Sequence, residues 1–229
     1  MSTLDEQGHG GMLNMDFTQR VVIDTGAQDW VASPMAGVWR KPLAREDAER
    51  GHATSIVRYE AGARFRAHNH PGGEEILVLE GTFSDETGDF HAGTYFRNPV
   101  GFRHAPYSEE GCVILVKLHQ FNADDEAHVV VDTHTTPFRT EGNIEALPLH
   151  THGTEQVCLL RLPTGETLPA RASAGGEEIY VISGAISDEQ GNYGAGCWLR
   201  GPRLSAATLR ADEDSLIWHK SGHLPLPAS

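Results

Sequence analysis

An internal repeat constrains the fold of this chain more than any other feature. The tetrapeptide Gly-Gly-Glu-Glu at residues 72–75 recurs at residues 175–178, 103 positions further along. The same offset needs no gap and also matches Gly62 with Gly165, Gly81 with Gly184, Gly93 with Gly196, Arg97 with Arg200, Pro99 with Pro202, and Asp85-Glu86 with Asp188-Glu189. Turn glycines and a proline that match together indicate two tandem copies of one unit. The length of 229 residues suits two domains of about 100 residues each.

Both copies read as short strands separated by turns. Runs rich in β-branched and apolar residues are bounded by Gly, Pro, Asp and Asn clusters, which is typical of an all-β sandwich or jelly roll. The expected strands are residues 54–59, 75–80 and 112–117 in the first copy, and residues 157–162, 178–183 and 215–219 in the second. Residues 44–50 fit one or two helical turns, but a polar loop is the preferred interpretation.

The first copy carries a set of metal-ligand residue types. His68 and His70 are two residues apart, so on a strand both side chains leave the same face. A Pro-Gly-Gly turn then precedes Glu74, and His104 follows from a separate segment. Three imidazoles and one carboxylate suit a single divalent ion such as zinc or Fe(II), with manganese, nickel or cobalt as alternatives.

Neighbouring residues offer one alternative ligand and a candidate lining. Glu75 becomes the ligand if the turn differs by one residue, although strand parity places it on the opposite face from Glu74. Arg66 and Phe102 share the parity of His68 and His104, which makes them candidate substrate-binding residues. Tyr107 is expected at the mouth of the site for the same role, and ordinary core packing is an equal interpretation for Phe102.

The spacing of these residues resembles the two motifs of the cupin family. Gly62, His68, His70, Glu74 and Gly81 read G-x5-H-x-H-x3-E-x6-G, and Gly93, Pro99, Gly101 and His104 read G-x5-P-x-G-x2-H. Ser108 stands where cupins often have Asn, which is not a ligand. From about Met15 onward the chain is similar to ChrR-type cupins, the anti-sigma factors and their relatives, and to acetylacetone dioxygenase-like cupins. The resemblance implies two tandem double-stranded β-helix (jelly-roll) domains, a bicupin.

The resulting domain prediction has four parts. Residues 1–36 form a lead-in with extra strands, which pack on the second copy or on a partner subunit. Residues 37–121 form the metal-binding cupin, residues 122–137 an acidic, polar connector, and residues 138–229 a metal-free cupin. At the ligand positions the second copy has Arg171, Ser173 and Ala207, and only Glu177 keeps its type. The second copy is therefore expected to act as a scaffold. A further hypothesis is a small-ligand pocket in which Arg171 binds an anion. Another is an ion pair between Arg171 and Glu177 at the place of the metal. His150 and His152 are interpreted as a surface or edge pair.

Composition excludes several partners. Lys and Arg number 18 against 32 Asp and Glu, a net charge of −14, whereas nucleic-acid and anionic membrane surfaces need basic patches. No apolar run approaches the roughly 20 residues of a membrane-spanning helix, and no secretory signal is visible. Three scattered cysteines favour reduced thiols and a cytoplasmic location. A monomer or a homodimer is expected.

Three functions remain possible for such a chain. The resemblance to ChrR-type cupins implies a small-ligand or oxidant-responsive metal-binding protein. Direct sigma-factor binding is not carried over, because the N-terminal region has neither a His-x3-Cys-x2-Cys zinc module nor a helical segment. The second possibility is a mononuclear non-haem Fe(II) dioxygenase that cleaves a β-dicarbonyl-type small molecule, although an intact Glu74 departs from the three-histidine site of those enzymes. The third is a purely structural cupin. No catalytic residue is assigned from sequence.

Overall fold

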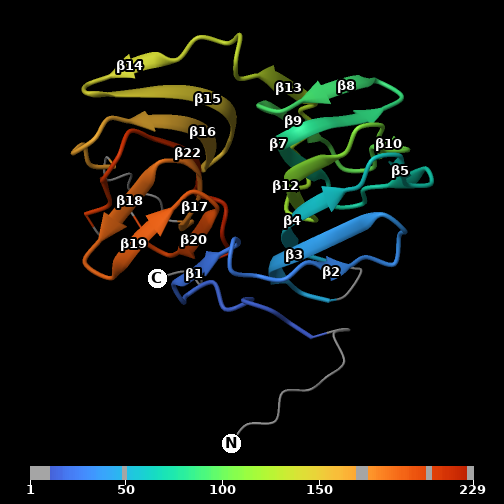
Figure 1. Cartoon of the computed structure of the whole chain (residues 1–229), viewed down its shortest axis with the longest axis horizontal. Helices are drawn as coiled ribbons and strands as arrows, with labels where there is room; N and C mark the ends of the chain where they lie inside the picture. The colour runs from blue at the N-terminus through green and yellow to red at the C-terminus, as the bar shows by residue number, and fades with distance from the viewer. Residues whose placement is uncertain (1–10, 48–50, 169–174, 205–207, 226–229) are drawn as a thin grey trace, which may run out of the picture.

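The computed structural model describes residues 11–47, 51–168, 175–204 and 208–225. Those ranges contain strands and turns but no helix, and so no helix that could cross a membrane. Figure 1 shows two β-lobes side by side, the first in blue to green and the second in yellow to red. The expected all-β fold with two tandem units is confirmed.

The first lobe is built around a sheet of order β13-β9-β7-β12-β4-β3-β2, in which β13 is Val129–Asp132, and short strands close the barrel over it. Its strands are β2 (Val31–Ala32), β3 (Val38–Arg45), β4 (Ala53–Tyr59), β5 (Ala63–Arg64), β6 (His68–Asn69), β7 (Glu74–Asp85), β8 (Gly88–His91), β9 (Thr94–Asn98), β10 (Arg103–His104), β11 (Tyr107–Ser108) and β12 (Cys112–Leu118). β6 pairs with β10, and β11 pairs with β5 and β7. The preferred loop at residues 44–50 begins late, because β3 continues through Arg45.

The second lobe repeats this order as β1-β20-β17-β22-β16-β15-β14, in which β1 is Val21–Asp24, beside a small sheet β19-β18-β21. Its strands are β14 (Arg139–Glu141), β15 (Ile144–His152), β16 (Glu155–Leu162), β17 (Glu177–Ser183), β18 (Ala185–Asp188), β19 (Gly191–Gly194), β20 (Cys197–Gly201), β21 (Arg210–Ala211) and β22 (Ser215–Ser221). Each barrel encloses its own apolar core. The six strands expected from the repeat are all present.

The two lobes exchange strands. β1 (Val21–Asp24), from the segment before the first barrel, pairs with β20 of the second lobe. β13 (Val129–Asp132), from the segment expected to be a connector, pairs with β9 of the first lobe. Each sheet is thus completed by the segment that precedes the other lobe's barrel. The residue boundaries given above between the four parts stay predictions.

Buried ion pairs join the lobes in a crossed arrangement. Lys117 Nζ lies 2.6 Å from Glu178 Oε2, and Lys220 Nζ lies 2.5 Å from Glu75 Oε2. The repeat offset carries Glu75 onto Glu178 and Lys117 onto Lys220, so exchanging the lobes maps one pair onto the other. Such self-complementary contacts are typical of a two-fold interface between subunits. The lobes therefore meet as the two subunits of a symmetric dimer would, around a shared apolar cluster.

Candidate metal centre

Three histidines converge at one end of the first barrel. β6 and β10 pair in a register that places His104 opposite His68, and His70 follows directly after β6. The ring centroids of His68 and His70 are 4.7 Å apart, and those of His70 and His104 are 4.9 Å apart. One ligand atom from each of the three lies within 4.8 Å of the others. The expected His68, His70 and His104 cluster is present.

The turn after His70 requires glycine. A Cβ added at Gly72 would lie 2.5 Å from the Cα of His119, and Gly73 has a φ of +76°. A side chain at residue 72 would clash with the backbone of His119, and a positive φ at residue 73 is strained for any residue but glycine. The turn starts β7 at Glu74 and brings that carboxylate back towards the histidines.

Hydrogen bonds on the far side of two rings fix their tautomers. The Nδ1–H of His68 donates to the carbonyl oxygen of Arg66 at 2.9 Å, and the Nδ1–H of His104 donates to Asp85 Oδ2 at 2.8 Å. In both residues this leaves Nε2 with a free lone pair. The Nε2 atoms of His70 and His104 are 2.9 Å apart. Imidazoles oriented in this way are typical of metal ligands.

Glu74 lies beside the histidines and Glu75 does not, and the role of Glu74 as a fourth ligand stays a prediction. Glu74 Oε2 lies 3.6 Å from His70 Nε2 and 3.4 Å from His104 Nε2, and it accepts a hydrogen bond from Asn98 Nδ2 at 3.0 Å. Glu75 points the other way and pairs with Lys220 at the interface between the lobes. Strand parity separates the two carboxylates.

The electrostatics of the cluster favour a bound cation. Burial, together with the charges of His104 and His68, lowers the pKa of His70 to about 3. Burial raises the pKa of Glu74, although His104 and Asn98 oppose that shift. Burial also lowers the pKa of His104, but the hydrogen bond to Asp85 and the charge of Glu74 outweigh it, so the net pKa is raised. The raised pKa values of His104 and Glu74 mean that this point attracts positive charge, and a divalent ion would take the place of the protons there. Three imidazoles and a carboxylate form a donor set that fits a borderline divalent metal.

Asp85 is a residue of this site that the sequence did not reveal. It accepts hydrogen bonds from the backbone N and the Oγ1 of Thr87, at 2.7 and 2.5 Å, as well as from His104. These donors outweigh the effect of burial and lower the pKa of Asp85. Asp85 matches Asp188 in the repeat, where the carboxylate instead pairs with Arg20 at 2.5 Å. Because both copies have an aspartate at this position, the sequence did not indicate that Asp85 contacts a metal-ligand histidine in the first copy alone.

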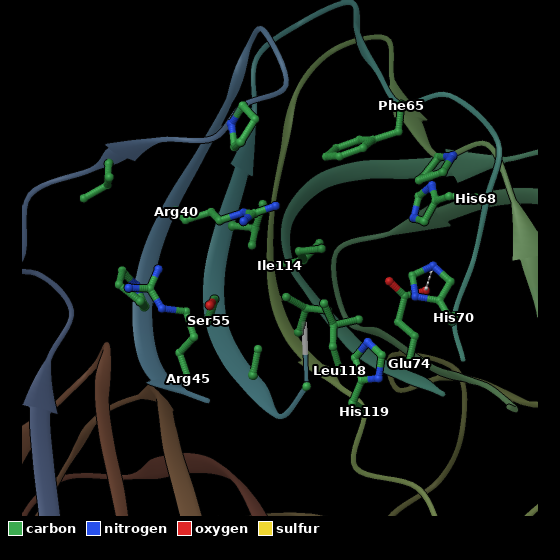
Figure 2. Close-up of a pocket in the computed structure, with 18 of the residues that line it drawn as sticks. Arg40, Arg45, Ser55, Phe65, His68, His70, Glu74, Ile114, Leu118 and His119 are labelled. Carbon is green, nitrogen blue, oxygen red and sulfur yellow. Dashed lines mark ion pairs between the residues drawn. The ribbon is translucent and has the colours of Figure 1, made fainter. Parts of the chain in front are cut away.

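A cavity of about 180 Å³ adjoins the cluster inside the first barrel. His68, His70 and Glu74 form part of its wall, and Phe65 and His119 lie beside them (Figure 2). The three predicted substrate-binding residues are not on this wall. Arg66 is exposed, Phe102 packs edge-on against the ring of His104 at 5.6 Å, and Tyr107 lies under the guanidinium of Arg64 at 4.7 Å. A substrate-binding role for these three residues stays a prediction.

The second barrel differs at the equivalent place. Within the described ranges, the only group of three or more potential metal ligands is that of the first barrel. Glu177 Oε1 lies 3.3 Å from His219 Nε2. Arg171, Ser173 and Ala207, and with them the expected Arg171–Glu177 pair, lie outside the described residues.

The expectation of a surface or edge pair at His150 and His152 is wrong for His150. This side chain is buried, and its Nε2 lies 2.9 Å from Asp125 Oδ2. Asp125 in turn accepts a hydrogen bond from the buried guanidinium of Arg97 at 2.7 Å. His150 therefore belongs to the polar network between the lobes, which the spacing of an isolated His-x-His cannot show.

Solved structures of similar fold span nearly the whole chain. A candidate dioxygenase from Nostoc punctiforme matches with a TM-score of 0.73 and 16% identity over 92% of this chain and 85% of its own. The pirin YhhW of Escherichia coli, in complex with nickel(II), gives 0.69 and 15% over 90% and 100%. The oxalate decarboxylase of Lactobacillus farciminis, in a formate complex, gives 0.64 and 12% over 90% and 87%. At these identities the likeness establishes the fold alone.

Sequence comparison identifies the family. No curated protein matches the chain. The profile of the ChrR cupin-like domain matches twice, at residues 18–122 and at residues 126–225. The two matches cover both lobes and agree with the internal repeat. The chain therefore belongs to the ChrR cupin-like family and carries two copies of its domain.

Proposed function

We propose that the first barrel binds one divalent metal ion through His68, His70, His104 and Glu74, and that the bound metal holds a small molecule in the adjoining cavity. The observation that carries this proposal is the convergence of the three imidazoles with Glu74, because His68, His70 and Glu74 form part of the wall of a cavity and His104 lies directly behind them. Zn(II) and Fe(II) both suit the ligands, and Mn(II) and Ni(II) are alternatives.

The surrounding residues support this role. Four protein ligands leave one or two positions of a five- or six-coordinate ion for a small molecule. Asp85 holds His104 in the tautomer that presents Nε2, and Asn98 holds the carboxylate of Glu74. A bound divalent ion would supply Lewis acidity, and Fe(II) would add redox chemistry with O₂.

An oxidant-responsive role would have to act through the metal centre. The three cysteines of the chain, Cys112, Cys158 and Cys197, are all buried. Burial raises the pKa of Cys112 to about 11 and also raises the pKa of Cys197. Thiols in such surroundings react slowly because the thiolate is the reactive form.

A second candidate function is Fe(II)-dependent dioxygenation of a β-dicarbonyl-type compound. The three histidines form a group of three potential ligands without Glu74, and Glu74 has Asn98 as an alternative partner. The solved fold of a candidate dioxygenase from Nostoc punctiforme agrees with this possibility. O₂ uptake by Fe(II)-loaded protein with a panel of β-diketones tests it, and the absence of uptake across the panel would rule out this substrate class.

The first test of the main proposal is metal content by elemental analysis, on protein purified without chelator or nickel affinity. We expect about one divalent ion per chain, and none in His104→Ala. Glu177→Gln, at the position that matches Glu74 in the second barrel, is the matched control and should keep one ion. Unchanged metal content in His104→Ala would refute the site.

A further inference from the structure

Two arginines line the cavity on the wall opposite the histidines. Arg40 and Arg45 both lie on β3, and Arg40 extends from that strand towards the middle of the cavity in Figure 2. Both side chains are partly buried. The Nε of Arg45 is buried and, among the described residues, has no hydrogen-bond partner. Among the described lining residues, Asp47 is the carboxylate at this end, and it lies at the exposed rim.

A β-bulge places Arg45 inside the barrel. The register between β3 and β4 shifts between Pro42 and Ala44, so the alternation of inward and outward side chains changes there. Leu43 and Ala44 are both fully buried in the cluster between the lobes. Arg45 then faces the cavity, as Arg40 and Pro42 do.

The second lobe shows that the fold does not require these arginines. β15 pairs with β16 as β3 pairs with β4, and the same bulge follows Pro148, the counterpart of Pro42. In this register, Ala146 takes the place of Arg40 and Thr151 takes the place of Arg45. The second copy thus lacks both arginines and also lacks the three histidines. The arginines and the metal ligands occur in the same barrel.

The dimensions limit what can lie between the two ends. Glu74, Leu118, Ala53 and Arg45 are neighbours in one row across the sheet. Three strand spacings of about 4.8 Å separate the ends of this row by at most about 14 Å. A cavity of about 150 Å³ accommodates benzene, so one of about 180 Å³ accommodates roughly six to nine heavy atoms. The wall between the ends is largely apolar, with Val57, Ile114, Val116 and Leu118.

We propose that Arg40 and Arg45 bind the carboxylate of a small dicarboxylate or oxo-acid whose other end reaches the metal site. Guanidinium groups present paired donors that match a carboxylate, and partial burial strengthens such charge-assisted hydrogen bonds. The inference rests on the proposed metal site for the far end of the ligand. It narrows the ligand from any small molecule to an acid with oxygen donors at both ends and a short apolar middle.

The test measures binding of malonate, succinate and glutarate by calorimetry, with the monomethyl ester of each acid as a ligand control. Zn(II)-loaded and metal-free protein are compared for the wild type, Arg40→Gln, Arg45→Gln and Arg64→Gln. Arg64 is the matched control because it is exposed, pairs with Glu109 and lies outside the cavity. An Arg40→Ala/Arg45→Thr variant carries the residues that the second lobe has, so it is expected to fold.

We expect at least one acid of the series to bind the loaded wild type. Each glutamine variant at Arg40 or Arg45 should weaken it by about tenfold or more at unchanged zinc content, and Arg64→Gln should not. Equal affinities in the wild type and the three glutamine variants would overturn the inference, and so would the absence of binding of any acid to the zinc-loaded wild type. Neither result would contradict the proposed metal site. A wild type that takes up no metal refutes the proposed function instead. The carboxylate contact is then judged by the same variants in metal-free protein, where equal affinities again overturn it.

Discussion

The hydrogen bond from His104 to Asp85 should control metal affinity, and Asp85→Asn is the change that tests it. One carboxylate oxygen accepts from His104, while the other accepts from the backbone N and Oγ1 of Thr87. An asparagine offers one oxygen and one NH₂ group, so it cannot satisfy both sets of donors. The substitution keeps the size of the side chain, removes its charge and replaces one acceptor oxygen with an NH₂ donor.

The orientation of the asparagine determines the size of the effect. If its oxygen faces His104, the tautomer is kept and only the charge is lost, which corresponds to about tenfold weaker metal binding. If its NH₂ faces His104, the ring favours a proton on Nε2, the atom aimed at the metal, and the loss approaches about a hundredfold. The expected range is therefore about 1.4–2.8 kcal/mol of binding free energy.

Competition with a chromophoric chelator for Zn(II) measures this loss directly. Asp188→Asn is the matched control, because Asp188 occupies the same repeat position but pairs with Arg20 and Tyr193. We expect wild-type zinc affinity in that variant. Equal affinities in the wild type and Asp85→Asn, with thermal unfolding unchanged, would show that Asp85 does not act on the metal through His104.

Three further predictions concern stability and the turn. Lys220→Met should cost about 3 kcal/mol in chemical denaturation, because it removes the buried cation at 2.5 Å from Glu75 and 2.9 Å from Glu155 and leaves Arg97 as the buried cation that both carboxylates share. A loss below 1 kcal/mol would contradict a structural role for the crossed pairs. Burial alone would raise the pKa of Glu75, but the charges of Lys220 and Arg97 outweigh it and lower this pKa from 4.5 to about 2. The ionised carboxylate therefore stabilises the fold fully above pH 4.5. About 3 kcal/mol of the free energy of unfolding should be lost as the pH falls towards 2. Glu75→Gln should flatten that part of the stability curve, and an unchanged slope would count against it. Gly72→Ala should lower both the unfolding temperature and the zinc affinity, because its Cβ would meet the backbone of His119 at 2.5 Å; wild-type values for both would exclude a tight turn.

Local spacing was enough to predict much of the fold and the centre of the site. The repeat predicted two equivalent barrels, and strand alternation predicted that His68 and His70 share a face and that Glu74 and Glu75 do not. Each of these predictions concerns residues that are close in sequence or that occupy the same position in the two repeats. For such residues, the geometry of the strand determines which face a side chain lies on. Strand parity groups Arg66 with His68, but Phe65 rather than Arg66 lies on the cavity wall. The alternation of side chains along a strand does not apply to residues 65 and 66, because β6 begins only at His68 and has two residues.

The sequence by itself determined that the chain is two ChrR-type cupin units with one set of metal-ligand residues. Only the tertiary structure decided which distant groups meet: Asp85 behind His104, Lys220 beside Glu75, and β1 on the sheet of the second lobe. It also decided that a bulge turns Arg45 into the cavity. The reason is physical. Side-chain direction along a regular strand follows from residue number, whereas a contact between segments far apart depends on how whole sheets pack and where their registers shift.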